Sequence, residues 1–371
     1  MITLQQGSLK EGSTTMIMNN YAKWAKSAQQ ILDEVNGLDK SCGSYEKKLA
    51  LAFSKYQMFV SKDYTQVENE VCVLCRMLKR VVKYYLEGNI QGAFASFSSF
   101  WNDSHSKDGI EQGFQTKYAC DYLIRGEKHL YRLRNMHGKV RQMKKEEMFH
   151  VPFSERGKAA NYRYSIAGYP CLYCGLSIFT CWMEMRCPHV TDMYYTAFKV
   201  RENRKLRLLD MRIPASAKDG DVQGPVKHIV MFPLVLACSI KVHPDKENDA
   251  FKEEYIIPQV LLHTLLKGKM SNKNGYDGCI YTSTQRNEDF PFLKVENLND
   301  NIVLFPHGDH REDYSSELLS KLKMCQPSSF DLMLIRHGFN LDKGSKGTDY
   351  SKSLFGRIEH QLNDSDFGDI L

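Results

Sequence analysis

The sequence predicts an α+β protein in which an all-α helical bundle precedes a domain of mixed strands and helices. Two observations favour this fold class. Through the first hundred residues, apolar side chains recur at steps of three and four, the period of an amphipathic helix. From residue 126 onward, short segments rich in Tyr, Val, Ile and Phe lie between turn residues, which is typical of strands.

Residues 1–125 are predicted to form a helical amino-terminal domain of roughly four helices. Apolar residues fall on one helical face within residues 21–32 and again within 63–86, where Glu87-Gly88 is a suitable helix end. A polar break at 102–109 indicates a linker or long loop, and residues 110–125 are expected to be helical again.

Residues 126–310 are predicted to form the α+β domain, and residues 311–371 a more polar carboxyl-terminal extension with two short helices. The expected strands are 129–134, 171–174, 194–200, 206–210 and 278–282. The expected helices between them are 176–186, 225–236 and 252–268.

The net charge, the apolar runs and the cysteine content limit the classes of function that the sequence fits. The net charge of +6 suits an anionic ligand such as a dinucleotide but is small for a dedicated nucleic-acid binder. The sequence shows neither a signal peptide nor an apolar run long enough for a membrane span, so we expect a cytoplasmic protein. Eleven cysteines, an odd number in apolar surroundings, indicate free thiols, and the two Cys-x-x-Cys pairs lie too far apart for an expected metal site.

The most informative stretch is 148–184. It contains Arg163-Tyr164-Ser165, a tight turn at 167–170, an expected strand that carries Tyr173, and a helix with an apolar stripe. Glu184 stands on that helix as a lone carboxylate in an apolar neighbourhood, so it must be solvated, paired or functional.

These motifs resemble the RES domain, a family named for an Arg, a Glu and a Ser. The first Arg is matched by Leu130-Tyr131-Arg132, with Arg134 as the alternative, and the Glu is matched by Glu184. Ser283, in the segment Gly278-Cys279-Ile280-Tyr281-Thr282-Ser283, matches the Ser and is preferred over Thr282 or Thr284. Asn301-Ile302-Val303-Leu304-Phe305 then matches a strand that opens with Asn.

The resemblance implies a fold similar to that of ADP-ribosyltransferases and cleavage of the nicotinamide–ribose bond of NAD. Glu184, Arg132 and Ser283 would be catalytic, because a carboxylate stabilises the cationic ribose formed in glycosidic cleavage. Arg132, Arg163, Tyr173, Tyr131 and Arg134 would bind NAD, because Arg binds pyrophosphate bidentately and Tyr can stack or donate to ribose.

We therefore expect an NAD glycohydrolase or phosphorylase that acts as a toxin or anti-phage effector, with NAD as substrate and no permanently bound cofactor. One alternative is an ADP-ribosyltransferase with a specific protein or nucleotide target. Another is a non-catalytic binding module whose helical bundle is the functional part. Expected partners are NAD and an antitoxin, activator or regulatory protein bound through the helical region; a homo-oligomer also fits, whereas membrane and nucleic acid are not expected.

Overall fold

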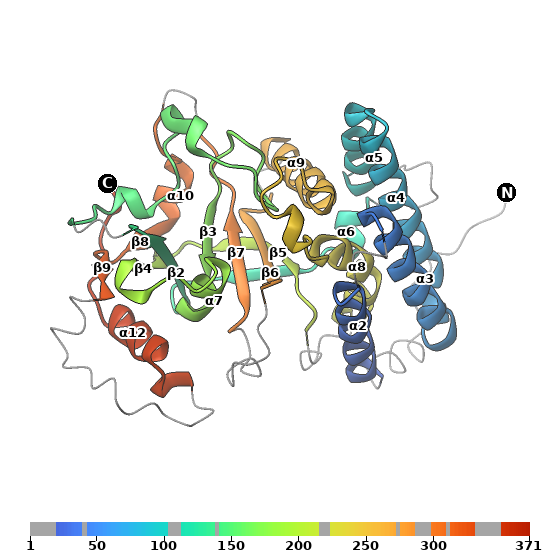
Figure 1. The fold of residues 1–371 in the computed structure, drawn as a ribbon, viewed down its shortest axis with the longest axis horizontal. Coiled ribbons are helices and arrows are strands. Elements are labelled where there is room, and N and C mark those ends of the chain that lie inside the picture. Colours follow the sequence, from blue (N-terminus) through green and yellow to red (C-terminus); the bar gives the residue numbers. More distant parts are fainter. Residues whose placement is uncertain are drawn as a thin grey trace. The chain divides into compact units, whose positions relative to one another are not determined.

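The computed structural model describes residues 20–38, 43–102, 113–137, 141–214, 223–271, 275–285, 298–308, 312–330 and 350–371 (Figure 1). The chain divides into two compact units. The first takes in the described residues of 1–120 and 211–271, and the second those of 121–210 and 272–371. Residues 211–271 lie inside the segment expected as one α+β domain, but their helices cluster with those of the amino-terminal region.

The first unit is all-α. Its helices are α2 (Tyr21–Asn36), α3 (Tyr45–Asp63), α4 (Glu68–Leu86), α5 (Ile90–Asn102), α6 (Phe114–Tyr118), α8 (Gly224–Ser239) and α9 (Ile256–Ser271). The first four confirm the helical amino-terminal region expected from the sequence. Helix α8 is apolar around most of its circumference, and it is correspondingly buried on nearly all sides within this unit.

A hydrogen-bonded chain ties helices α2 and α3 to α8. Pro233 lies inside α8 and has no N–H, so the carbonyl of Ile229, four residues earlier, lacks its usual helical donor. The Tyr56 hydroxyl donates to that carbonyl at 2.7 Å, and Trp24 Nε1 donates to the same hydroxyl at 2.9 Å. The buried tyrosine therefore replaces the hydrogen bond that the proline removes.

The second unit is built on a nine-stranded sheet among the described residues. Its order is β1-β5-β6-β7-β3-β2-β4-β8, with β9 paired to β4, and every pairing with a described register is antiparallel. The strands are β1 (Asp121–Ile124), β2 (His129–Asn135), β3 (Leu172–Gly175), β4 (Met193–Val200), β5 (Leu206–Met211), β6 (Gly278–Thr282), β7 (Asp300–Leu304), β8 (Leu322–Met324) and β9 (Ser328–Ser329).

The expectation of a helix throughout 110–125 is wrong. Helix α6 covers only Phe114–Tyr118, and Asp121–Ile124 is strand β1, which pairs with β5. Along β1 the side chains alternate between exposed and buried, with Tyr122 and Ile124 directed into the core, which is the two-residue period of a strand. Strands β8 and β9 of the carboxyl-terminal segment are also absent from the sequence-based prediction.

The sheet carries a core on each face. Leu130, Leu172 and Ile302 belong to one core. Tyr131 and Ala197 face the other, which is covered by α7 (Ile178–Glu184) and α12 (Leu354–Asn363). Figure 1 shows both helices beside the strands β2, β3 and β4. The remaining helix of this unit is α10 (Ser316–Lys321).

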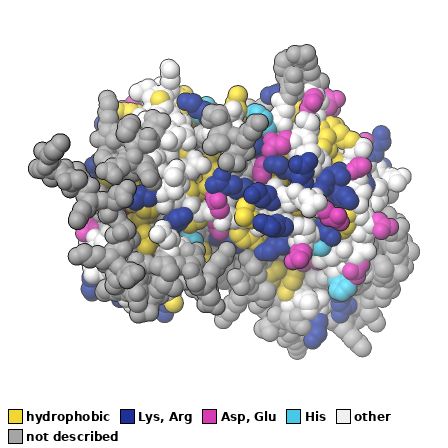
Figure 2. Space-filling model, turned by 180° about the vertical axis from the view of Figure 1, so that it is seen from behind, with side chains coloured by type: hydrophobic (Ala, Val, Ile, Leu, Met, Phe, Trp, Pro, Cys, Tyr) yellow, Lys and Arg dark blue, Asp and Glu magenta, His cyan; other side chains and the backbone are white. Residues whose placement is uncertain are grey.

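The surface reflects the positive net charge. Lys and Arg side chains gather, with a few acidic ones among them, on part of the face seen in Figure 2. No helix in the described ranges is both long and apolar enough to cross a membrane. The cysteines that the structure describes are free thiols, most of them buried, as the sequence predicts.

Candidate active site

Helix α7 places Glu184 at its last residue. Ser177 precedes the helix, and its Oγ accepts the backbone N–H of Thr180 at 2.9 Å and so caps the amino-terminal turn. Glycine is required at position 175, because a Cβ there would lie 2.8 Å from Cys181 Sγ and from the Ser177 carbonyl oxygen. This close approach seats the helix against the end of β3.

Two buried side chains hold the Glu184 carboxylate. Ser283 Oγ donates to Glu184 Oε1 at 2.5 Å, and Asn301 Nδ2 donates to the same oxygen at 2.6 Å. The two donors are only 6% and 4% exposed, whereas Glu184 itself is exposed. Among the described residues, Oε2 of Glu184 has no hydrogen bond. One carboxylate oxygen is therefore fixed, and the other is available to a ligand.

The register of β6 separates Ser283 from its neighbour Thr282. Thr282 lies opposite Asp300 and donates to its Oδ1 at 3.3 Å. Ser283 is one residue further and therefore points to the opposite face, toward Glu184. Its Oγ accepts the backbone N–H of Gln285 at 3.0 Å, which leaves the hydroxyl proton for the carboxylate. The structure thus brings Ser283, rather than Thr282, to Glu184.

Arg132 lies where strands β2 and β3 separate. These strands share a single register pair, Tyr131 with Gly175. Just beyond it, Arg132 Nη1 donates to the Tyr173 carbonyl at 2.8 Å, so the side chain supplies a cross-strand bond. Its buried Nε has no hydrogen-bond partner within the described ranges. Burial lowers the pKa of this guanidinium, but Arg stays protonated in proteins.

Arg163 occupies a two-residue turn between Tyr162 and Ser165, which exchange both of their backbone hydrogen bonds. Arg163 is 9% exposed, and its neighbour Tyr164 packs its ring 4.7 Å from that of Tyr281. Tyr281 lies two residues before Ser283 on the same face of β6. The packing of Tyr164 therefore places the Arg163 turn beside the Glu184 cluster.

The turn expected at 167–170 is present. Gly168 has a φ of +85°, a left-handed conformation that favours glycine. Its N–H donates to the Ala159 carbonyl at 2.9 Å. The chain then enters β3, where the half-buried Tyr173 has its ring 5.8 Å from that of Tyr162, edge to face.

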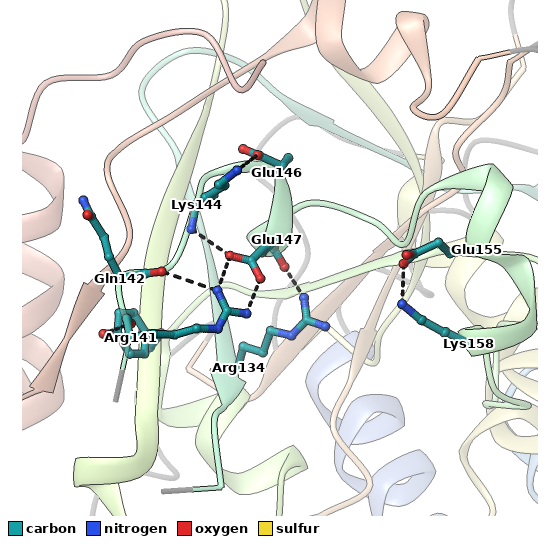
Figure 3. Close-up of polar contacts among 9 residues, drawn as sticks. Arg134, Arg141, Gln142, Lys144, Glu146, Glu147, Glu155 and Lys158 are labelled. Carbon is teal, nitrogen blue, oxygen red and sulfur yellow. Dashed lines mark hydrogen bonds and ion pairs between the residues drawn. The ribbon is translucent and has the colours of Figure 1, made fainter. Parts of the chain in front are cut away.

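Two residues expected to bind NAD are not brought to Glu184. Tyr131 is buried under α7 and α12, and its hydroxyl donates to Asn363 Oδ1 at 2.8 Å. Arg134 is exposed and donates through Nη1 to the carbonyl of Glu147 (Figure 3). Of the described basic residues after it, Arg141 and Lys144 pair with Glu147 and Glu146 in the same loop, whereas Lys145 donates to the Asp369 carbonyl.

Two contributors have no role in the sequence-based prediction. Asn301 matches the Asn of the strand motif, but only the structure shows its bond to Glu184. Glu359, on α12, accepts the backbone N–H of Ile178 at 2.6 Å at the start of α7. No local pattern links Glu359 to Glu184, because the contact joins segments 181 residues apart.

The arrangement suits stabilisation of positive charge by an oriented, solvent-accessible carboxylate. In the part of the chain that the structure describes, no three His, Cys, Asp or Glu side chains are grouped so as to hold a metal ion.

Comparison with known proteins identifies similar sequences. The family model described as "RES domain" matches residues 129–320, just over half of the chain. A protein of Bacillus subtilis (strain 168) named "Putative toxin YopC" is 30% identical over 241 residues, which cover 62% of this chain and 51% of that protein. The chain thus spans about half the length of this curated relative. No solved structure matches the chain.

Proposed function

The chain belongs to the RES domain family, and from that premise we propose that the Glu184 site binds NAD and breaks its nicotinamide–ribose bond. One observation carries the proposal: Ser283 and Asn301 both donate to Oε1 of an exposed carboxylate, whose Oε2 is left for a ligand. This is the geometry required of a group that must meet positive charge as it develops on a sugar.

The reaction follows from the chemistry of the bond. The bond between the ring nitrogen of nicotinamide and ribose C1′ breaks, and its electron pair stays on nicotinamide, which leaves uncharged. The ribose becomes oxocarbenium-like, and the Glu184 carboxylate stabilises that charge. Water attacks C1′ and releases its proton to solvent, which gives ADP-ribose. If phosphate attacks the same carbon instead, the product is ADP-ribose 1″-phosphate, in which this ribose carries the double-prime numbers.

The other residues take roles that their contacts allow. Ser283 commits its proton to Glu184, so it orients the carboxylate rather than binding the ribose. Arg132 and Arg163 supply positive charge for the pyrophosphate, and the unfilled Nε of Arg132 is a donor for it. Tyr173 presents an aromatic ring to the sugar or to nicotinamide.

A toxin role is the biological part of the proposal. It is supported by the name of the Bacillus subtilis relative, and loss of NAD would harm the cell that makes the enzyme. Such an activity needs restraint, and we assign the binding of an antitoxin or activator to the all-α unit, as expected from the sequence.

The test uses chromatography to measure the release of nicotinamide from NAD by the full chain. We expect release by the wild type, and a fall of at least 10²-fold in kcat for Glu184→Gln. Glu202→Gln, an exposed glutamate in the turn between β4 and β5, is the matched control. No release by the wild type, with or without candidate activators, or equal release by Glu184→Gln, would refute the assignment.

The products separate the alternatives. Free ADP-ribose indicates hydrolysis, the 1″-phosphate indicates phosphorolysis, and labelled ADP-ribose on a macromolecule indicates a transferase. NAD binding without any product would favour the non-catalytic binding module.

A further inference from the structure

Tyr162 is an exposed aromatic residue in a rigid setting. It is 54% exposed, one of the few large apolar side chains among the described residues of the second unit that solvent reaches to this extent. Its backbone is fixed on both sides, because its N–H and carbonyl bond with Ser165 at 2.9 and 3.1 Å. The adjacent Tyr164 is anchored under the turn, 1% exposed and packed on Tyr281. The fold therefore holds the Tyr162 ring in solvent with little freedom of its backbone.

The same ring borders the candidate active site. It meets the Tyr173 ring edge to face, with centroids 5.8 Å apart and planes at 71°. The Tyr173 carbonyl is the acceptor of Arg132 Nη1. Tyr162 thus contacts the residue to which the cation proposed to bind pyrophosphate is hydrogen-bonded.

We propose that Tyr162 stacks on the adenine ring of NAD and determines the preference of the site for a dinucleotide. This inference rests on the proposed function for its ligand. Aromatic side chains bind nucleobases by stacking, because every base offers a planar π-face. An exposed, pre-positioned ring gains this contact at little cost in conformational freedom.

The distance from Glu184 favours adenine over nicotinamide. Glu184 bonds Asn301, which lies opposite Gly175 on β3. Tyr173 is one same-face step of about 7 Å from Gly175, and the Tyr162 ring is a further 5.8 Å from that of Tyr173. Nicotinamide is attached directly to the ribose that Glu184 must meet. Adenine lies beyond the pyrophosphate, and Tyr162 lies beyond Tyr173 on this path of contacts from Glu184.

The test compares NAD with nicotinamide mononucleotide, which lacks the adenosine part. For Tyr162→Ala we expect KM for NAD to rise about tenfold with kcat within about twofold. KM for nicotinamide mononucleotide should be unchanged by the same substitution. Tyr162→Phe should behave as wild type, because the ring is kept. Phe251→Ala, which removes a 49% exposed ring from the other unit, is the control.

A binding measurement separates this inference from the proposed reaction. ADP-ribose is titrated into wild type and Tyr162→Ala by calorimetry, and we expect about tenfold weaker binding by the variant. If the wild type releases no nicotinamide, the proposed reaction fails, and this titration alone decides the role of Tyr162. Equal ADP-ribose affinity of the two proteins, or an equal rise in KM for both nucleotides, would overturn the adenine assignment.

Discussion

Glu359 Oε1 accepts the backbone N–H of Ile178 at 2.6 Å, and this contact joins α12 to the first residue of the helix that ends in Glu184. The Tyr350 hydroxyl donates to the same oxygen. Residues 350–371 lie beyond the part of the chain that matches the RES domain, yet Glu359 among them bonds the first residue of the helix that carries Glu184. That helix is therefore held in part by a segment outside the matched region.

Glu359 should make stability depend on pH. Burial raises its pKa from 4.5 to about 7, although its two hydrogen bonds act in the opposite direction. The folded protein therefore binds a proton more tightly than the unfolded chain, and stability from this group falls as pH rises from 4.5 to 7. The full effect is up to about 3 kcal/mol. Urea unfolding of Glu359→Gln should lack this fall and show a more stable protein above pH 7.

The exposed Glu202→Gln is the matched control for Glu359→Gln and should retain the wild-type profile. A Glu359→Gln variant with an unchanged pH profile would show that Glu359 has an ordinary pKa in the folded protein.

His150 should make an opposing contribution. It is 1% exposed, its Nδ1 donates to the Val151 carbonyl at 2.8 Å, and its Nε2 accepts the Ser315 N–H at 3.0 Å. These bonds require a neutral ring, and burial lowers its pKa from 6.5 to about 4. Because the unfolded chain binds the proton more tightly, stability from this group is lost as pH falls from 6.5 to 4, by about 3 kcal/mol in full.

Proton NMR of the histidine rings tests this assignment, with His150→Gln used to identify the signal. We expect the His150 resonance to stay unshifted above pH 5. A midpoint near 6.5 would contradict the buried, neutral ring.

Asn301 and Ser283 should act as one unit, because both donate to the same oxygen of Glu184. We expect Ser283→Ala and Asn301→Ala each to lower kcat on the order of 10²-fold through misplacement of the carboxylate. The double variant should lose much less than the product of the two effects. Thr282→Val, on the other face of β6, is the control and should keep near-normal kcat. Effects that simply multiply would show that the two residues act independently.

The sequence predicts the parts of this site that lie on continuous motifs. Glu184 ends a helix whose apolar stripe is visible in the sequence, and Ser283 follows a strand of the expected length. The contact of Asn301 with Glu184 depends on the register of β7 against β3, which no local period specifies. Tyr131, by contrast, is expected at the site but does not reach it. Side chains alternate along β2, so Tyr131 lies on the other face from Arg132, in the core under α7.

Local sequence patterns also do not predict how the chain divides into its two units. Helices α8 and α9 are recognisable as helices from their apolar runs, but their clustering with the amino-terminal helices follows from tertiary contacts. One such contact is the bond from Tyr56 to the Ile229 carbonyl, made 173 residues apart.

Arg132 and Arg134, the two alternatives for the first Arg of the motif, should differ sharply in activity. Arg132 lies at the strand opening with an unfilled Nε, whereas Arg134 is exposed and already donates to the Glu147 carbonyl. We expect Arg132→Lys to raise KM for NAD at least tenfold, because Lys keeps the charge but loses the planar fork. For Arg134→Gln, KM for NAD should stay within about twofold of the wild-type value.

Since Arg132 also bonds the Tyr173 carbonyl, the thermal midpoint of each variant is measured alongside KM. A loss in Arg134→Gln equal to that in Arg132→Lys, at unchanged thermal midpoint, would move the pyrophosphate contact to Arg134.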